Sequence, residues 1–362
     1  MWGRKYVDIV KKISRKNFLI IRLTVGLAVL VAGIIFGRFY LNDVSVPTPV
    51  VGSDDIIIDN NEPTVVSPIN GAPVSSTAER VVAVMIDNHG DARPQSGIAS
   101  AARVVYEAPV EGGITRFMVV FSQNDEVVEV GPVRSARPYF LDWMREYGDA
   151  LYLHSGGSPA ALAELKNSSM FDGNEFWRGS YFWRDAVAIA PHDLYTSAAK
   201  WRQQITDYGA SRANPAWEGW KFSDVAIEPT DTIIPAKSVT IKFAPNYIVR
   251  WTFDDVIWRY QRALNGQLVH TRALENVLAT TIAIQIVPVK ILDEAGRLEV
   301  GTVGSGEARV LRDGVLIRGS WKKDSESART RFYDQTNNEI LFASGNIWIE
   351  VVPVGTEIQV TS

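Results

Sequence analysis

The sequence predicts an α/β (α+β) protein: an N-terminal transmembrane helix, a flexible stalk, an α/β domain with a mixed sheet, and a β-rich C-terminal part. Three observations predict this order. A basic segment and a long apolar run open the chain, a proline-rich stretch follows, and short apolar strands then fill the remainder. With 46% hydrophobic and 22% charged residues, the 362-residue chain has a globular composition.

Composition excludes several classes of function. The 37 Lys and Arg residues are outnumbered by 41 Asp and Glu residues, which gives a formal net charge of -4. Nucleic-acid-binding domains usually carry a basic excess, so we expect no nucleic-acid partner. The chain has no cysteine, which excludes disulfides, thiolate metal sites, a thiol nucleophile and a lipidated cysteine. Four histidines leave little room for a histidine-rich site, and no resident metal is predicted.

The N-terminal segment predicts the cellular location. Residues 1–17 form a basic cytoplasmic segment, and the apolar residues 18–41 are long enough to cross the roughly 30 Å core of a bilayer. Basic residues at the N-terminal flank place the N-terminus in the cytoplasm and the bulk of the chain outside. The alternative is a cleaved signal peptide, but the run is long for one and no clear cleavage pattern follows it. We therefore predict a single-pass plasma-membrane protein.

The stalk covers residues 42–79, where five prolines stand among Ser, Thr, Asp and Asn. This composition is typical of an extended linker with little packing. An ordered loop that wraps the following domain is the alternative for its last part, Ser67–Gly71.

Residues 80–210 alternate between strands and helices, as an α/β layer fold does. Ser158 followed by Pro159 predicts a helix start, and a further helix is predicted over residues 197–208. A third helix is predicted over residues 140–147, shortly after Pro138. The predicted strands cover residues 81–86, 104–107, 117–121, 127–130 and 150–153.

The sequence predicts that residues 211–362 are β-rich. They are expected to form either a separate domain or an extension of the same sheet. Turn signals at Asn265–Gly266 and Asp313–Gly314 separate the predicted strands. A polar and aromatic group, Arg259, Tyr260, Arg262 and His270, is interpreted as a solvated sheet face. The predicted strands cover residues 239–243, 248–253, 256–260, 281–287, 315–317, 330–333 and 347–352.

Polar residues of the first region cluster beside glycines at the predicted ends of strands, where α/β sheets form ligand crevices. Four arginines there carry planar, permanently charged groups that suit phosphate or carboxylate. The turn before Pro159 would also direct backbone N–H groups at an anion. The alternative is that the arginines pair with Glu107, Glu111 and Asp142 in structural networks. The candidate ligand-binding residues are Asp87, Asn88, Arg93, Gln95, Glu107, Glu111, Arg116, Arg134, Ser135, Arg137, His154, Ser158 and His192.

Catalytic signals are weaker. Asp87, Glu107 and Glu111 offer oxygen ligands to a divalent cation, or pair with arginine. His154 and His192 stand near serines and Asp193, but the chain lacks the Gly-x-Ser-x-Gly turn of a serine nucleophile. No catalytic residue is assigned, and the question of turnover stays open.

Seven motifs of the first region resemble the YerB family of bacterial cell-envelope proteins, which are often lipoproteins and carry a domain of unknown function. They are Val84–Asn88, Ala92–Gly97, Val105–Glu107, Glu111–Phe117, Gly131–Arg137, His154–Ser158 and Pro191–Thr196. With similar segments at Ser67–Gly71 and Gly345–Pro353, the resemblance covers residues 67–353. It implies an extracytoplasmic location and a two-part fold, but no activity. Ile34 stands where the lipidated cysteine of those lipoproteins would be, and Asp193 replaces an expected asparagine.

The layout of anchor, strands and Arg-x-x-Arg is also similar to that of LytR–CpsA–Psr phosphotransferases, with Thr115–Arg137 as the loosely matching segment. The predicted function is binding of an anionic wall polymer, a lipid-linked precursor or a wall-synthesis protein through the arginine-rich crevice. The alternative is phosphoryl transfer from a polyprenyl-pyrophosphate-linked glycopolymer. In that case Mg²⁺ would be the cofactor, and Asp87 or Glu107 would serve as ligand or base.

Overall fold

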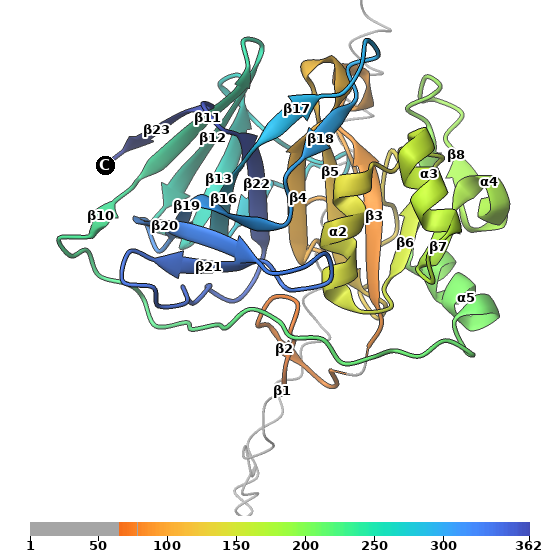
Figure 1. Ribbon diagram of the computed structural model, residues 1–362, viewed down its shortest axis with the longest axis horizontal. Coiled ribbons are helices and arrows are strands. Elements are labelled where there is room, and N and C mark those ends of the chain that lie inside the picture. The colour runs from red at the N-terminus through yellow and green to blue at the C-terminus, as the bar shows by residue number, and fades with distance from the viewer. Residues whose placement is uncertain (1–64, 78) are drawn as a thin grey trace, which may run out of the picture. The chain divides into compact units, whose positions relative to one another are not determined.

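Two β-sheets dominate the computed structural model of the chain, which describes residues 65–77 and 79–362 (Figure 1). These residues belong to one compact unit. The main sheet has the order β10-β20-β19-β16-β22-β4-β5-β3-β6-β7, with β21 paired to β20. Its strands are β3 (Val81–Asp87), β4 (Val104–Pro109), β5 (Thr115–Ser122), β6 (Leu151–His154), β7 (Phe171–Asn174), β10 (Ile233–Pro235), β16 (Thr281–Val287), β19 (Gly304–Arg312), β20 (Val315–Lys323), β21 (Arg331–Asp334) and β22 (Ile347–Pro353).

The second sheet is antiparallel and has the order β14-β13-β12-β11-β23, with β15 paired to β13. Its strands are β11 (Ser238–Ala244), β12 (Tyr247–Asp254), β13 (Arg259–Leu264), β14 (Gln267–Leu268), β15 (Leu278–Ala279) and β23 (Glu357–Thr361). Three two-stranded ribbons are formed by β1 (Val65–Val66) with β2 (Pro73–Val74), β8 (Trp183–Arg184) with β9 (Leu194–Tyr195), and β17 (Val289–Ile291) with β18 (Leu298–Val300).

Helices and the second sheet cover the two faces of the main sheet. The helices α2 (Pro138–Met144) and α3 (Pro159–Lys166) pack on one face of β3 and β6 (Figure 1). On the other face lie α5 (Ala198–Tyr208) and the second sheet. Because both of its faces are covered, β3 is buried along its whole length, which explains its uninterrupted apolar sequence. The remaining helical turns are α4 (Glu175–Arg178), η1 (Gly90–Ala92), η2 (Glu111–Gly113), η3 (Arg145–Tyr147) and η4 (Gly179–Tyr181).

Strand direction brings the carboxyl ends of several strands to one edge. β3, β6 and β7 are parallel neighbours, and β3 and β4 both run antiparallel to β5. The ends of β3, β4, β6 and β7 and the beginning of β5 therefore lie together, and we call this the carboxyl edge. Segment 131–136 runs along it: Asp87 N donates to Pro132 O (2.8 Å), and Ser155 N donates to Arg134 O (3.1 Å).

The helices predicted from Ser158 and over 197–208 are confirmed as α3 and α5, and the one predicted over 140–147 is α2 followed by the turn η3. Ser158 Oγ accepts from Ala161 N (3.3 Å), Ser197 Oγ accepts from Lys200 N (3.4 Å), and Pro138 opens α2. The two predicted turns are also confirmed, with positive φ at Asn265 (49°) and Asp313 (55°). They join β13 to β14 and β19 to β20.

Two strand predictions are wrong. Residues 127–130 contain a bend at Val128 and pair only through an isolated bridge, Val130 with Thr196, so they form no strand. Residues 256–258 belong to the turn between β12 and β13, so β13 begins at Arg259. In both segments a local apolar pattern lacks a neighbour strand along most of its length.

The main sheet is built from both regions of the body. β22 lies between β16 and β4 and is parallel to both, so the strands of residues 211–362 continue the sheet of residues 80–210. The end of the stalk is an ordered loop, because Ile69 and Asn70 are buried between β1 and β2. The predicted cytoplasmic segment 1–17 and transmembrane helix 18–41 lie outside the described residues. In residues 65–77 and 79–362, no helix has the length and apolarity needed to span a membrane.

Candidate functional site

The candidate residues gather at the carboxyl edge, but they divide between the two faces of the main sheet. Side chains alternate along a strand, so Asp87 shares the face of Met85 beneath α2 and α3, and its register partner Arg116 shares the face of Met118. Glu107 lies on the opposite face of the main sheet, the same face as Val105, and points toward the second sheet. We call the first group the helix-side cluster (Asp87, Glu111, Arg116, Arg134, Arg137) and the second the sheet-side cluster (Asn88, Glu107, Thr115, Tyr247, Arg262).

Asp87 is the centre of the helix-side cluster. Its Oδ2 lies 2.7 Å from Arg134 Nε and 2.7 Å from His192 Nδ1, and its Oδ1 accepts from His89 N (3.1 Å). Burial alone would raise the pKa of this carboxyl, but Arg134 and the hydrogen bonds outweigh burial and hold the pKa below its ordinary value. Asp87 is therefore a buried carboxylate that stays ionised at neutral pH.

Glu111 and Arg137 form a two-pronged pair in the same cluster. Arg137 Nε donates to Glu111 Oε1 (2.8 Å), and Arg137 Nη2 donates to Glu111 Oε2 (2.8 Å). Burial opposes ionisation of Glu111, yet the bonds from Arg137 lower its pKa below the ordinary value. This pair matches the structural-network alternative for Arg137.

Arg116 is the unbalanced member of the cluster. It donates from Nη1 to Ser135 O (2.9 Å), and its Nε is buried without a hydrogen-bond partner. It forms no ion pair with a carboxylate in the described part of the chain. Burial first, and then the charge of Arg137, lower its pKa to about 10. Three arginines thus face two carboxylates, and the excess positive charge lies on the most buried of the three.

The sheet-side cluster surrounds Glu107. Glu107 Oε2 accepts from Arg262 Nη2 (2.6 Å), and both side chains are almost completely buried. Glu107 Oε1 accepts from Thr115 Oγ1 (2.6 Å) and Tyr247 Oη (2.6 Å). Both carboxylate oxygens of Glu107 are thus engaged within the cluster, although Arg262 Nε is buried without a hydrogen-bond partner.

Asn88 joins Arg93 and Gln95 to that network. Its Nδ2 donates to Thr115 Oγ1 (2.7 Å), while its Oδ1 accepts from Arg93 Nε (3.1 Å) and Gln95 Nε2 (2.8 Å). The Arg93 guanidinium also lies 5.1 Å from the centre of the Tyr247 ring. Arg93 therefore belongs to the sheet-side cluster and is not part of one crevice with the other three arginines.

His154 and Ser158 shape the turn between β6 and α3. His154 is fully buried, with Nδ1 2.7 Å from Gly156 O and Nε2 2.8 Å from Asp172 Oδ1. Since both ring nitrogens are engaged, the histidine holds the turn in place. Ser158 caps α3, and Ser135 meets Arg116 through its backbone carbonyl.

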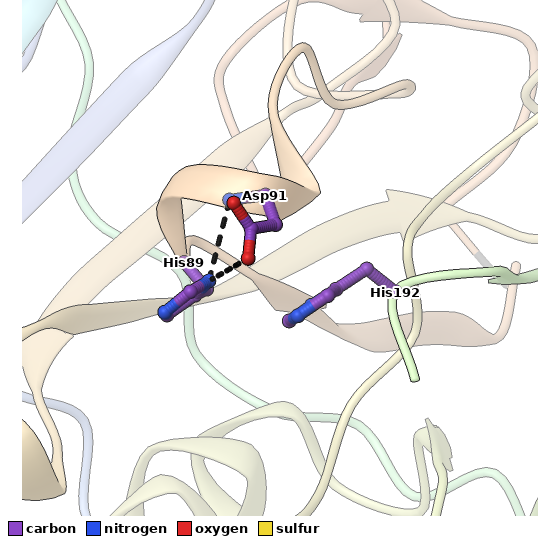
Figure 2. A group of neighbouring side chains, drawn as sticks. All are labelled: His89, Asp91 and His192. Atoms are coloured by element: carbon purple, nitrogen blue, oxygen red, sulfur yellow. Dashed lines mark hydrogen bonds and ion pairs between the residues drawn. The ribbon is translucent and has the colours of Figure 1, made fainter. Parts of the chain in front are cut away.

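A third group lies beside Asp87. The rings of His89 and His192 are stacked with their centres 5.0 Å apart and their planes 7° apart, and Asp91 extends toward His89 (Figure 2). Asp91 Oδ2 lies 3.5 Å from His89 Nδ1. Asp91 and His192 also line a cavity of about 420 Å³, together with Arg93 and Arg272.

Comparison with known proteins places the chain in a family. Residues 69–211 match the model of the N-terminal domain of DUF3048, described as a protein of unknown function, and residues 239–349 match the model of its C-terminal domain. The chain belongs to the DUF3048 family.

Two similarities to a Bacillus subtilis protein agree with this result and confirm the YerB-family resemblance. A protein of strain 168 described as "Putative lipoprotein YerB" is 31% identical over 290 residues, which cover 76% of this chain and 82% of that protein. The crystal structure of B. subtilis YerB matches with a TM-score of 0.71 and 28% identity, over 82% of this chain and 99% of that one.

The DUF3048 fold brings residues of both family domains into the sheet-side cluster. Asn88, Glu107 and Thr115 lie in the segment matched by the N-terminal model, whereas Tyr247 and Arg262 lie in the segment matched by the C-terminal model. The interpretation of Arg262 as part of a solvated face is wrong, because Arg262 is buried against Glu107. Its position two residues after the aromatic Tyr260 on a strand was the available signal that it points inward.

Other expected pairs differ as well. Asp142 Oδ1 pairs with Arg145 Nη1 at 2.9 Å. Among the described residues it forms no ion pair with any of the four candidate arginines. Sequence reasoning also missed His89 and Asp91, for which the nearness of Asp87–Asn88 was the available signal.

Proposed function

We propose that this chain is a membrane-anchored, extracytoplasmic cell-envelope protein that binds an anionic wall polymer or lipid-linked precursor at the helix-side cluster. The description of its B. subtilis relative as a lipoprotein supports a membrane-attached role. Because this sequence contains no cysteine, the apolar segment 18–41 would act as the anchor here in place of a lipid.

The observation that carries the binding proposal is the state of Arg116. A buried guanidinium without an anionic partner is costly, and an anionic ligand would supply the missing charge. Arg134 and Arg137 lie close enough to influence its charge state, so the cluster offers three planar donors in one place. Arg134 keeps a quarter of its side chain exposed, which gives a ligand access from solvent.

The phosphotransferase alternative receives less support from the geometry. Its magnesium ligands would be Asp87, Glu107 and Glu111, but Glu107 lies on the opposite face of the sheet and is closed off by Arg262, Thr115 and Tyr247. Asp87 and Glu111 are each occupied by an arginine. These three carboxylates do not form a common oxygen site.

Thermal unfolding of the full chain in detergent tests the proposal, with a short-chain prenyl pyrophosphate and with anionic wall fragments as separate probes. A ligand at about 100 times its Kd stabilises the folded state by about 2.7 kcal/mol. For a chain of this size we expect an increase in Tm of several degrees, at roughly 2–4 °C per kcal/mol. The increase should shrink at high salt because the contacts are ionic.

Arg116→Gln is the decisive variant. The substitution removes the buried guanidinium charge, and no carboxylate loses an ion-pair partner. We therefore expect the Tm of the variant without ligand to be no lower than that of the wild type, and we expect no increase in its Tm with ligand. Arg309→Gln, on β19 away from the cluster, is the matched control and should respond like the wild type. An equal response of Arg116→Gln, or no response of the wild type to either probe, would contradict the proposal.

A further inference from the structure

His89, Asp91 and His192 form a group of potential metal ligands that the proposed anion site does not use. One ligand atom of each residue lies within 4.8 Å of the others. The three residues approach from two segments far apart in sequence, and the two rings and the carboxylate lie together in Figure 2. We propose that these residues bind a divalent transition metal, for which Zn²⁺ is the best match.

The ligand types select the metal. Two imidazoles and one carboxylate are a common donor set for catalytic or exchangeable Zn²⁺, which leaves a fourth position open. Mg²⁺ and Ca²⁺ prefer sites made of oxygen atoms, so two ring nitrogens disfavour them. The absence of cysteine from the chain leaves histidine and carboxylate as its strongest zinc ligands.

Asp87 supplies a second, independent feature of such a site. Asp87 Oδ2 lies 2.7 Å from His192 Nδ1, and Arg134 and His89 N hold that carboxyl group in position. A carboxylate oxygen accepts a hydrogen bond, so this contact assigns Nδ1 as the donor and leaves Nε2 as the ring atom that can bind a metal. Histidine ligands of metals regularly have a carboxylate behind them in this way. His192 is thus oriented before any metal arrives.

The other two ligands must move to complete the site. A metal lies in the plane of each imidazole that binds it, and two parallel stacked rings do not share one plane. His89 and Asp91 are 46% and 71% exposed, whereas His192 is 11% exposed, so the first two have room to turn toward the third. Turning His89 breaks the hydrogen bond that its Nδ1 accepts from Asp91 N (3.2 Å). The ligand atoms would close to about 3.3 Å, the separation in tetrahedral zinc sites.

The surroundings indicate what the open position would face. Asp91 and His192 line the cavity of about 420 Å³ whose wall also contains Arg93 and Arg272. Arg272 is paired with Asp185 (2.7 Å), while Arg93 is held by the neutral Asn88. A metal here would therefore present its open position to a cavity with an uncompensated arginine, which suits water or a small anion.

Calorimetric titration of untagged, chelator-treated full chain with Zn²⁺ tests the site, with Co²⁺ absorption as a report on coordination. We expect one Zn²⁺ per chain, a visible Co²⁺ band of tetrahedral intensity, and no comparable binding of Mg²⁺. His89→Ala removes an exposed ligand and should weaken Zn²⁺ binding at least tenfold. Asp87→Asn should weaken it by about 10–100-fold through the orientation of His192.

His270→Ala is the matched control, because His270 lies in the segment between β14 and β15 and should leave Zn²⁺ affinity unchanged. Circular dichroism and thermal unfolding of every variant identify any loss of fold, and the exposed His89 keeps the test interpretable if Asp87→Asn unfolds. Unchanged affinity in His89→Ala, loss of affinity in His270→Ala, or no binding of Zn²⁺ to the wild type would each overturn the proposal.

Discussion

Glu350 shows how one buried residue depends on the charge of its neighbour. It lies opposite Glu107 in the parallel pair of β22 and β4, and both side chains are fully buried. One arginine, Arg262, serves the two carboxyls and pairs with Glu107. Burial and then the charge of Glu107 raise the pKa of Glu350 well above its ordinary value, which favours the protonated, neutral form of this carboxyl.

We expect Glu350→Gln to be tolerated, and increasingly so as the pH rises. The folded wild type keeps a proton on Glu350 that the unfolded chain releases above pH 4.5. Folding therefore loses stability with rising pH in this window, and a glutamine, which does not titrate, lacks that loss. Urea denaturation at pH 5 and pH 8 should show the variant gaining relative to the wild type at the higher pH. A larger relative loss at pH 8 would show that Glu350 is ionised in the folded state.

Glu107→Gln is the contrasting substitution at this pair. It leaves the buried Arg262 without its counter-charge, and breaking a buried ion pair in this way costs about 3–5 kcal/mol. The same urea series should show this loss at pH 8. Equal effects of the two glutamine variants would mean that the two carboxyls share the charge evenly.

At the scale of elements, α3 connects the local sequence to the carboxyl edge. The helix has eight residues, and Ser158 and Pro159 fix its start. The turn before it holds His154 and contacts segment 131–136, since Ser158 N donates to Ala136 O (3.2 Å). Loss of the cap would therefore loosen the helix and also the turn beside Arg134.

Ser158→Ala should destabilise the protein by about 1 kcal/mol, the usual effect of losing a serine cap. Ser158→Asp is the matched control, because aspartate accepts the same hydrogen bond from Ala161 N and should retain most of the stability. Urea denaturation at pH 7 measures both variants. An equal loss in Ser158→Asp would mean that the serine acts through something other than capping.

Local signals explain which elements the sequence predicts well. The starts of α2, α3 and α5 rest on prolines and serines within a few residues of the helix, and the hairpin turns rest on adjacent residue pairs. The strand predicted over residues 127–130 does not form, because a strand needs a partner strand along its length. Here the pairing of Val130 with Thr196 is confined to one bridge.

The site is harder to predict because its partners are distant in sequence. Arg262 meets Glu107 across 155 residues, and His192 meets Asp87 across 105. The sequence pattern predicts which polar residues lie at strand ends, but it does not predict the face of the sheet on which each side chain lies. That division separates Arg93 from Arg116, Arg134 and Arg137, and it follows from the register of β3, β4 and β5.

For the whole molecule, the shared main sheet ties the two family domains together. β22 comes from the C-terminal part and lies directly beside β4 of the N-terminal part. Trp348 on β22 contacts Phe117 of β5 and Trp251 of the second sheet, with ring centres 5.5 and 5.0 Å apart. The main sheet has one hydrophobic core on each face, and each core contains residues from both the N-terminal and the C-terminal part. This arrangement favours one cooperative unfolding unit over two independent domains.

Ile349→Ala on β22 tests this cooperativity. The side chain is buried in the core beneath α2, and its truncation should cost about 2–5 kcal/mol. If the described part of the chain unfolds as a unit, the opening free energies measured by amide exchange in β3 and in β20 should both fall by the same amount. This is expected even though β22 is adjacent to neither strand in the sheet order. A change confined to β20 and β16 would show instead that the two halves open separately. In that case the contacts between Glu107 and Arg262 would be an interface between domains that can part.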